Sequence, residues 1–470
     1  MIDEILVSVS PGETRIACLT GGRAVELHRF LHGRATTLGN VYLGRITRVV
    51  AGMGAAFVEI GASKAGFLPV PADPAARAAL HEGARAIVQV TREPERGKGA
   101  QLSASVRLPG HFLVYMPTGD GIHVSRRIGE ETDAGRIKAA LEALSLPGEG
   151  WIARTNAPDG TPAQFAHEAG ALRARWNDIG QRAAATTPPS LLYSEASPIA
   201  GILRDKASAA VRRIVVDDAD AFAAAEAFLS SYRPELSSAL SRHTGPIPLF
   251  EMEGIEVEFE RVWDRRVPLP SGGSLVIERT EALWAIDVNT GRHIGGSSAE
   301  ATIRATNLEA AVEAARQIRL RDLGGLIVVD FVHMDEDATG REQVLNAFRD
   351  ALAEDPTPVR LTGFSDLGLI ELSRRRGRPA VDQQFEVPCE VCDGTGFVQV
   401  PLLTALAAFR EAARGTAAGG PIRIAVPPSV AAVMETPEAQ AARRELVARS
   451  GRSVEIIVDS TVAADRFRLD

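Results

Sequence analysis

The stretch Ala285-Ile286-Asp287-Val288-Asn289 is a short apolar run that ends on polar residues, and Gly325-Leu326-Ile327-Val328-Val329-Asp330-Phe331 is a second run of the same kind. Both runs are short, rich in β-branched residues and bounded by glycine, so they predict buried strands. Apolar residues between them are spaced as on one face of a helix. These residues are Ile303, Leu308, Ala311, Val312, Ala315 and Ile318. The pattern predicts a crossover between two neighbouring parallel strands.

The two strands deliver polar side chains to one edge of a sheet, where open α/β sheets bind ligands. Asp287, Asn289 and Asp330 are therefore expected to converge. Oxygen ligands of this kind suit Mg²⁺ or Mn²⁺, which usually also take phosphate oxygens of a substrate. The alternative is that the aspartates cap helices or form salt bridges, the commoner role of a lone aspartate at a strand end. Spacing alone does not decide between the two.

Length and composition indicate a soluble protein of several domains. Single cores rarely grow past roughly 250–300 residues, and the chain has 470, of which 45% are hydrophobic and 24% charged. We find no apolar run long enough to span a bilayer and no leader, so we expect a cytoplasmic protein. Three cysteines argue against a disulfide framework.

The net charge of −8 gives no general attraction for nucleic acid, so local clusters of arginine decide that question. Arginines can grip phosphate with two hydrogen bonds, although a charge run is more often a solvated face. The clusters are Arg374-Arg375-Arg376 with Arg378, then Arg316, Arg319 and Arg321, and finally Arg126-Arg127.

Residues 35–108 are predicted to form a small all-β module. Its five short strands fit an OB-fold barrel, and they are expected near 41–50, 55–60, 66–69, 84–93 and 100–107. Alternation puts Val58 and Ile60 on one face of the second strand and Phe57 on the other. An aromatic residue on the wet face of such a barrel can stack on a base; the alternative is that Phe57 packs under a loop.

The rest of the chain reads as alternating strands and helices. An apolar stripe of Phe165, Ala169, Leu172, Trp176 and Ile179 predicts a helix at about 163–185. The other expected elements are strands at 1–34, 111–116, 151–156 and 214–216, and a small α/β region at 401–470 with a linker around 415–420.

The pair Cys389 and Cys392, followed by glycines, has the spacing of half a zinc site. A structural site needs four ligands, and the remaining cysteine, Cys18, lies far away in a predicted strand. A second copy of the chain could complete a Cys₄ site across a two-fold axis. The alternatives are a redox pair or two plain surface thiols.

The chain resembles the ribonuclease E/G family, the endoribonucleases that initiate bacterial RNA decay and process structured RNA precursors. The resemblance covers essentially all 470 residues, and no long scaffold tail is expected. Its most specific stretches are 39–46, 55–61, 270–273, 285–291 and 319–325.

The resemblance implies a multidomain α/β and α+β fold. It comprises a split RNase H-like domain, an OB-fold barrel, a 5′-sensor segment, a DNase I-like catalytic domain, a zinc link and a small C-terminal α/β domain. In this order the domains would span 1–34 with 200–270, 35–108, 109–199, 271–385, 386–400 and 401–470.

The resemblance also implies roles for single residues. Asp287 and Asp330 would hold a catalytic Mg²⁺, with Asn289 in support, and Cys389 and Cys392 would hold a Zn²⁺ shared by two chains in a homodimer or a dimer of dimers. The RNA-binding residues would be Phe57, Phe67 and Lys98. The residues that sense a 5′-monophosphate would be Gly110, Val114, Arg126, Arg154 and Thr155.

Three features depart from the family pattern. Glu390 stands where members usually have proline, and His333 where an acidic residue is often found. The OB module is also short between Pro69 and Arg85. These departures bear on metal preference and rate more than on the type of reaction.

Mg²⁺ held by two carboxylates would activate water to cut single-stranded RNA, leaving 5′-phosphate and 3′-hydroxyl ends. The chain is expected to prefer RNA with a 5′-monophosphate, unless Arg154 instead pairs with a carboxylate such as Glu168. Two other readings are a catalytically weak RNA-binding dimer and a metal-dependent phosphoesterase acting on a small molecule. The intact aspartate set disfavours the first, and the OB-like module and arginine clusters disfavour the second.

Overall fold

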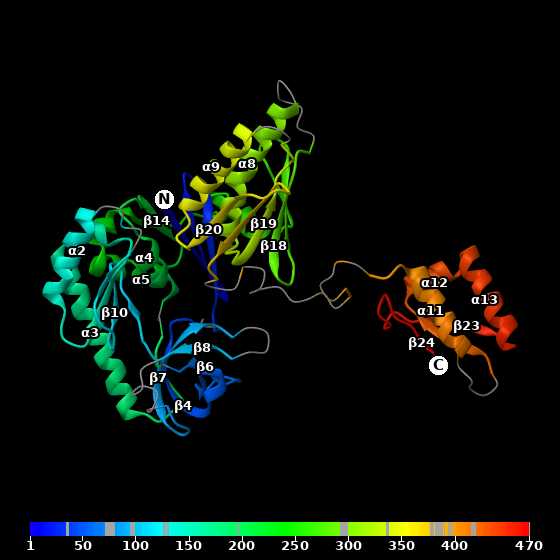
Figure 1. The fold of residues 1–470 in the computed structure, drawn as a ribbon, viewed down its shortest axis with the longest axis horizontal. Coiled ribbons are helices and arrows are strands. Elements are labelled where there is room, and N and C mark those ends of the chain that lie inside the picture. Colours follow the sequence, from blue (N-terminus) through cyan, green and yellow to red (C-terminus); the bar gives the residue numbers. More distant parts are fainter. Residues whose placement is uncertain are drawn as a thin grey trace. The chain divides into compact units, whose positions relative to one another are not determined.

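The structure, a computed structural model, divides into two compact units, Met1–Gln384 and Phe385–Asp470 (Figure 1). The described residues are 1–33, 37–70, 80–94, 99–125, 128, 131–194, 197–291, 299–334, 338–376, 380, 389, 391–392, 396, 398–414 and 420–469, with only the backbone at 51, 299 and 338.

The first three strands of the chain share a sheet with two strands that come much later, in the order β15-β14-β1-β2-β3. β1 is parallel to β14 and antiparallel to β2. Helices α4 and α5 cover one face of this sheet, while α6 and α7 cover the other. Both segments predicted for the RNase H-like domain therefore contribute to one sheet, and that assignment itself stays a prediction. The elements are β1 (Glu4–Ser10), β2 (Glu13–Thr20), β3 (Arg23–Leu31), α4 (Pro198–Lys206), β14 (Arg213–Val216), α5 (Ala219–Tyr232), η3 (Pro234–Ala239), β15 (Leu240–Arg242), α6 (Leu249–Met252) and α7 (Glu256–Arg261).

Five strands close into a barrel in the order β4-β5-β6-β8-β7, and β7 pairs back with β4. This confirms the OB-like barrel. Its interior holds Ile46, Val58, Leu68, Val88 and Leu102. β8 is shorter than the predicted strand, and β13 extends the sheet beyond β4. The elements are β4 (Val41–Val50), η1 (Ala51–Met53), β5 (Ala55–Glu59), β6 (Gly66–Pro69), β7 (Arg85–Arg92), β8 (Gln101–Ser103) and β13 (Ser190–Tyr193).

A four-stranded sheet, β11-β12-β10-β9, packs against α2 and α3. Thr161 caps α3 and exchanges hydrogen bonds with Gln164, which fixes where the helix begins. The predicted stripe of this helix is buried, with Trp176 partly so. The elements are β9 (Leu108–Pro109), β10 (Leu113–Met116), β11 (Ile122–Val124), α2 (Glu131–Leu144), β12 (Gly150–Ala153), η2 (Ala157–Asp159) and α3 (Pro162–Ala185).

The predicted crossover lies in a six-stranded sheet of order β16-β17-β18-β19-β21-β20. β18 and β19 are parallel neighbours, as the sequence predicts. Helices α8 and α9 pack on one face, over Ile286, Val288, Ile327 and Val329. The elements are β16 (Arg266–Pro268), β17 (Ser274–Arg279), β18 (Leu283–Asn289), α8 (Ala299–Leu320), β19 (Gly325–Asp330), α9 (Ala338–Ala353), β20 (Val359–Phe364) and β21 (Leu369–Arg374).

One residue of the predicted helical stripe is placed wrongly. Val312 is 50% exposed, whereas Ala311, Ala315 and Ile318 are buried. The buried face of α8 is centred on alanines such as Ala314, which lies on the opposite side of the helix from Val312. The prediction relied on the larger apolar residues, and it therefore placed the buried face of the helix too close to Val312.

In the second unit, β22 lies between parallel β23 and antiparallel β24, and three helices complete a core of its own. This region combines helices with a small sheet, and its assignment as the C-terminal domain of the family stays a prediction; most of the predicted linker, 415–419, lies outside the described residues. The elements are α11 (Pro401–Arg414), β22 (Ile422–Val426), α12 (Pro428–Met434), α13 (Pro437–Ser450), β23 (Val454–Val458) and β24 (Arg468–Leu469).

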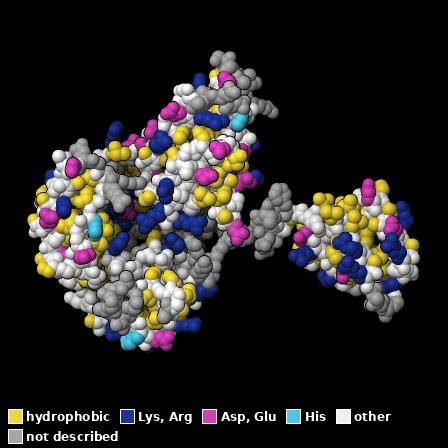
Figure 2. All heavy atoms as spheres, viewed as in Figure 1, with side chains coloured by type: hydrophobic (Ala, Val, Ile, Leu, Met, Phe, Trp, Pro, Cys, Tyr) yellow, Lys and Arg dark blue, Asp and Glu magenta, His cyan; other side chains and the backbone are white. Residues whose placement is uncertain are grey.

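Acidic and basic side chains are intermixed over the visible face of both units (Figure 2). Lys and Arg side chains gather in the middle of the larger unit, between β20 and β8. Among the described residues, no helix combines the length and the hydropathy that crossing a membrane requires.

Candidate functional site

Asp287 and Asp330 are direct Cα partners across β18 and β19. Asn289 donates from Nδ2 to Oδ2 of Asp287 at 2.6 Å. Alternation along β18 puts Ile286 and Val288 into the helix-covered core, so both aspartates project from the open face of the sheet and are exposed. The structure thus brings the set together near the carboxyl ends of the strands, on a face rather than at the predicted edge.

A cleft of about 280 Å³ opens beside the aspartates. His333 lines it, at the position where the family resemblance leads one to expect an acidic residue. Gly368 faces His333, since a Cβ there would lie 3.9 Å from Nδ1. Two carboxylates on the wall of an open cleft are suitable ligands for a hydrated divalent cation. The lining residues are Asp287, Val288, Asp330, Phe331, Val332, His333, Leu367 and Gly368.

Asn307 on α8 holds the backbone of Val332, one of the residues that line this cleft. It is fully buried, donates from Nδ2 to the carbonyl of Val332 at 2.7 Å, and accepts from the Val332 N–H at 3.0 Å. The two bonds fix the backbone that follows Asp330. Asn307 was not among the predicted site residues, although a polar residue beside the apolar stripe of a predicted helix is a usable signal.

Arg154 is held by two acceptors. Its NH1 donates to the carbonyl of Gly110 at 2.5 Å, and its NH2 donates to Oδ1 of Asp205 at 2.7 Å. Burial alone would raise the pKa of Asp205, but the guanidinium groups of Arg154 and Arg204 lower it well below its ordinary value. The expected competitor, Glu168, is therefore wrong as the partner of Arg154, and Asp205 takes that place.

Glu168 instead accepts hydrogen bonds from the backbone N–H groups of Phe112 and Leu113, all at 3.1 Å. Its burial raises the pKa of this carboxyl above the ordinary value despite these bonds. A Cβ on Gly110 would lie 1.6 Å from Oε1 of Glu168. Gly110 is thus a glycine because a carboxylate fills the space beside it.

The other predicted sensor residues lie around the same sheet. Val114 is paired with Ile152 across β10 and β12. β12 ends at Ala153, so Arg154 and Thr155 follow the strand, which corrects the prediction of a strand over 151–156. The exposed hydroxyl of Thr155 lies 3.4 Å from that of Ser125. Arg126 lies outside the described residues.

Phe57 and Phe67 are Cα partners on neighbouring strands of the barrel. Their rings meet edge to face with centroids 6.2 Å apart. Neither ring belongs to the barrel interior, as alternation predicts for Phe57, and both rings are half-buried. Lys98 lies outside the described residues.

Cys389 is exposed and Cys392 is half-buried. The backbone N–H of Gly396 donates to Sγ of Cys392 at 3.3 Å. Within the described residues of one chain, no third metal-ligating side chain gathers with this pair. Two thiolates are half the ligand set that a tetrahedral Zn²⁺ site needs, so the zinc site stays a prediction.

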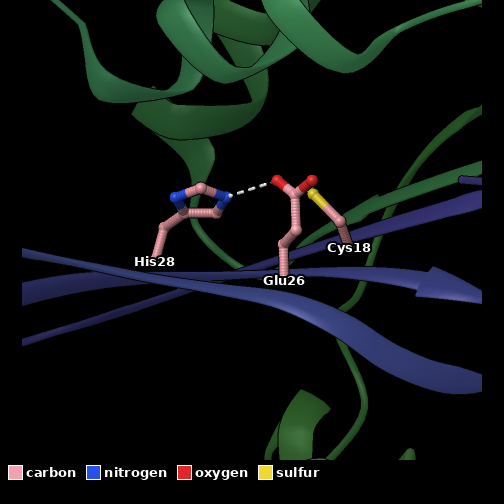
Figure 3. A group of neighbouring side chains, drawn as sticks. All are labelled: Cys18, Glu26 and His28. Carbon is pink, nitrogen blue, oxygen red and sulfur yellow. Dashed lines mark hydrogen bonds and ion pairs between the residues drawn. The ribbon is translucent and has the colours of Figure 1, made fainter. Parts of the chain in front are cut away.

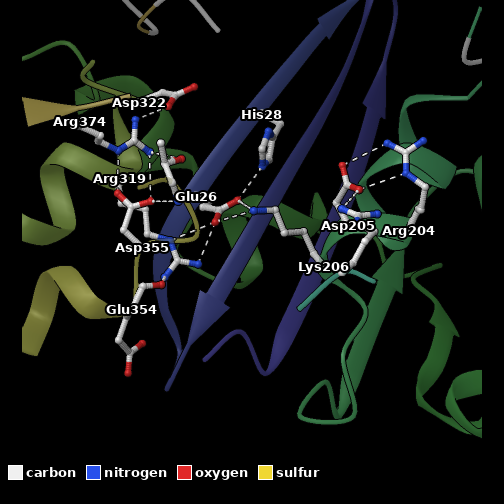
Figure 4. A network of polar contacts seen from close by, with 12 residues as sticks. Glu26, His28, Arg204, Asp205, Lys206, Arg319, Asp322, Glu354, Asp355 and Arg374 are labelled. Carbon is white, nitrogen blue, oxygen red and sulfur yellow. Dashed lines mark hydrogen bonds and ion pairs between the residues drawn. The ribbon is translucent and has the colours of Figure 1, made fainter. Parts of the chain in front are cut away.

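Cys18, Glu26 and His28 form a buried group of possible ligand atoms (Figure 3). The carboxylate of Glu26 is already engaged by Lys206 at 2.6 Å and by Arg319 at 2.8 Å (Figure 4). Burial opposes the charge of Glu26, but these cations and His28 lower its pKa well below the ordinary value. Lys206 and Arg319 already balance the charge of this carboxylate, so Glu26 joins β3 to α4 and α8 through ion pairs.

Four of the clustered arginines have structural partners, namely Arg316, Arg319, Arg321 and Arg374, while Arg126, Arg127 and Arg378 lie outside the described residues. Arg374 is buried against Asp355 at 2.7 Å and Asp322 at 2.6 Å. Arg316 pairs with Glu313, and Arg321 donates to Gln317 at 2.7 Å. These contacts account for the positions of these arginines without a bound phosphate. Arg375 and Arg376, by contrast, are exposed.

Residues 107–377 match the model of the ribonuclease E/G family. This segment includes β18, β19 and the sheet that holds Arg154. The chain belongs to the ribonuclease E/G family. It is 36% identical to ribonuclease G of Escherichia coli strain K12, with 88% of each chain covered.

The chain is also similar to a second ribonuclease G and to a ribonuclease E. It is 35% identical to ribonuclease G of Haemophilus influenzae, with 87% of each chain covered. It is 37% identical to ribonuclease E of Escherichia coli strain K12, over 82% of this chain and 38% of that one. The resemblance drawn from the quoted motifs is confirmed.

Proposed function

We propose that this chain cleaves single-stranded RNA internally in a Mg²⁺-dependent reaction that leaves 5′-phosphate and 3′-hydroxyl ends, as a step in RNA processing and decay. As a member of the ribonuclease E/G family, it is an endoribonuclease. The observation that carries the metal-dependent part is the register that makes Asp287 and Asp330 neighbours on the wall of an open cleft.

In this proposal Asp287 and Asp330 bind the metal ion, and the Asn289 amide orients the Asp287 carboxylate through their hydrogen bond. A Mg²⁺ held by these residues would supply Lewis-acid chemistry toward the scissile phosphate and the attacking water. Asn307 keeps the backbone after Asp330 in place, which limits the movement of the carboxylates. Precise placement of this kind is what metal-assisted hydrolysis demands of the protein.

The barrel provides the contact to bases. Phe57 and Phe67 form an aromatic pair outside the barrel interior, where unstacked bases can pack. A preference for single strands follows, since bases in a duplex are not available for stacking. Lys98 would add a phosphate contact from the same barrel.

The preference for a 5′-monophosphate rests on Arg154. Its guanidinium is anchored by Gly110, and its second acceptor is a carboxylate, which a terminal phosphate can replace with the same hydrogen bonds. Thr155, Val114 and the neighbouring Arg126 would complete that pocket.

Two chains would share one Zn²⁺ through Cys389 and Cys392 of each. The spacing of the thiols and the N–H bond to Cys392 support a metal-binding turn. A homodimer, or a dimer of dimers, would supply the other two ligands, because the described residues of one chain bring no third ligand to the pair.

The function is tested with a 5′-monophosphorylated single-stranded oligonucleotide incubated with and without Mg²⁺. We expect internal cleavage only with the metal, and mass analysis of the products should find 5′-phosphate and 3′-hydroxyl termini. A cyclic phosphate at the 3′ end, or equal rates in EDTA, would contradict the proposed chemistry.

A further inference from the structure

A second cleft, of about 500 Å³, lies between the barrel and the sheet that carries the aspartates. One wall comes from barrel strands β7 and β8, and the other from the start of β19 and the residues after β21. It coincides with the region where basic side chains gather in Figure 2. The lining residues are Thr91, Arg92, Gln101, Gly325, Arg375 and Arg376.

Arg92, Arg375 and Arg376 give the cleft a positive charge that the described part of the chain does not compensate. All three are exposed, and none belongs to the ion pairs of the described residues. The adjacent Arg374, by contrast, is buried between two aspartates. The chain as a whole carries a net charge of −8. Three exposed cations in one cleft nevertheless make the local potential positive, which favours binding of an anion there.

The position of Arg376 depends on two glycines. A Cβ on Gly325 would lie 2.7 Å from NH2 of Arg376, and one on Gly324 would lie 3.1 Å from its Cγ. Gly325 also has a φ of +101°, which side chains rarely allow. The Arg376 side chain therefore packs directly against the backbone of these two glycines. This contact fixes the position of its guanidinium in the cleft.

The cleft lies beside the aromatic pair of the barrel. Gln101 is the Cα partner of Phe67, whose ring meets that of Phe57. On the other wall, β19 runs from Gly325 to Asp330, roughly 17 Å at about 3.3 Å per residue. A strand of RNA can thus contact the barrel, the cleft and the sheet in succession.

We propose that this cleft binds the phosphodiester backbone of single-stranded RNA, with Arg92, Arg375 and Arg376 contacting successive phosphates irrespective of sequence. Guanidinium groups match phosphate oxygens with paired hydrogen bonds, and Thr91 and Gln101 add neutral donors. The inference rests on the proposed function, since it takes RNA to be the substrate.

The test measures binding of a 5′-hydroxyl single-stranded oligonucleotide in an Asp287→Asn background over a series of salt concentrations. Each phosphate contact contributes about 0.7 to the slope of log affinity against log salt for single strands. Arg92→Gln with Arg375→Gln and Arg376→Gln should therefore flatten the slope by about 2 and weaken binding at least tenfold at low salt. Arg349→Gln, an exposed arginine on α9, is the matched control and should change neither.

Variants that change one wall at a time distinguish binding in the cleft from a general effect of surface charge on RNA affinity. Arg92→Gln alone and Arg375→Gln with Arg376→Gln should each remove part of the slope. A triple variant that behaves like Arg349→Gln would overturn the cleft as an RNA site. A different outcome would overturn the proposed function instead. In that outcome the Asp287→Asn protein, which keeps all three arginines, does not bind RNA, and the wild type does not cleave it.

Discussion

Asp287 and Asp330 are paired in register on adjacent parallel strands, so one register shift along β19 would separate the two carboxylates. Their positions are fixed by the apolar residues on either side, which the helices α8 and α9 cover. A two-carboxylate arrangement of this kind is therefore a consequence of core packing. Each residue can be changed without disturbing that core, because both side chains are exposed.

Asp287→Asn or Asp330→Asn should lower the rate of RNA cleavage by orders of magnitude and leave RNA affinity nearly intact, because the metal acts mainly in the transition state. The measurement is cleavage kinetics together with equilibrium binding in EDTA. Asp350→Asn, on the exposed side of α9, is the control and should cleave normally. Cleavage at the wild-type rate by either variant would exclude the pair as the metal site.

Arg154 and Asp205 should control the preference for a 5′-monophosphate over a 5′-hydroxyl. A charge-assisted contact is worth roughly 1.5–3 kcal/mol, so the wild type should prefer the monophosphate about tenfold to a hundredfold. Arg154→Gln should abolish the preference and retain the slower cleavage of 5′-hydroxyl RNA. Asp205→Asn should raise the preference severalfold, because it removes the charge that competes with phosphate for Arg154.

The double variant of Arg154 and Asp205 is the control for this pair. Asp205→Asn should have no effect once Arg154 is glutamine, since the two residues act through one contact. If Asp205→Asn instead lowers the preference as Arg154→Gln does, Asp205 positions the arginine and does not compete with the phosphate.

Phe57→Ala should weaken single-stranded RNA binding about fivefold to a hundredfold, since stacking on one aromatic residue contributes roughly 1–3 kcal/mol per base. Phe57→Tyr keeps the ring and should bind like the wild type. Fluorescence anisotropy with a labelled oligonucleotide measures both. Unchanged affinity in a folded Phe57→Ala protein would show that this face of the barrel is not used.

Cys389→Ser combined with Cys392→Ser should lose Zn²⁺ and shift the protein from dimer to monomer, because the tetrahedral site needs thiolates from two chains. Metal analysis and light scattering measure the two effects. Cys18→Ala, which removes the buried third thiol, should retain the metal. A wild-type dimer that contains no zinc would contradict the shared site.

Glu26→Gln should lower the free energy of unfolding by about 3–5 kcal/mol, because it leaves Lys206 and Arg319 partly buried without their carboxylate. Urea unfolding measures this, with Glu251→Gln on the exposed side of α6 as a control that should stay within about 0.5 kcal/mol. The folded-state pKa of Glu26 is lowered, so its contribution is complete above the unfolded pKa of about 4.3. The difference between wild type and Glu26→Gln should therefore hold from pH 7 to about pH 5 and shrink as the pH falls further. A constant difference down to pH 3 would contradict this link.

Periodicity predicted the elements that repeat regularly. The parallel pair β18–β19, the barrel strands and the long helix α3 follow directly from alternation and from apolar stripes. Val312 was misplaced because small alanines, not the larger apolar residues, occupy the centre of the buried arc of α8. The strand that was expected to include Arg154 ends at Ala153, because a turn of 3-10 helix with Pro158 begins soon after.

The sequence by itself determined which residues of β18 and β19 could carry chemistry, since a two-residue period along a strand puts Asp287 and Asn289 on one face. Only the tertiary structure decided the partners of charged groups. Arg154 meets Asp205 rather than Glu168, and Arg374 is buried while Arg375 and Arg376 line a cleft. The physical reason is that ion pairs form between side chains far apart in the chain, and their pairing depends on how sheets and helices pack, which no local pattern records.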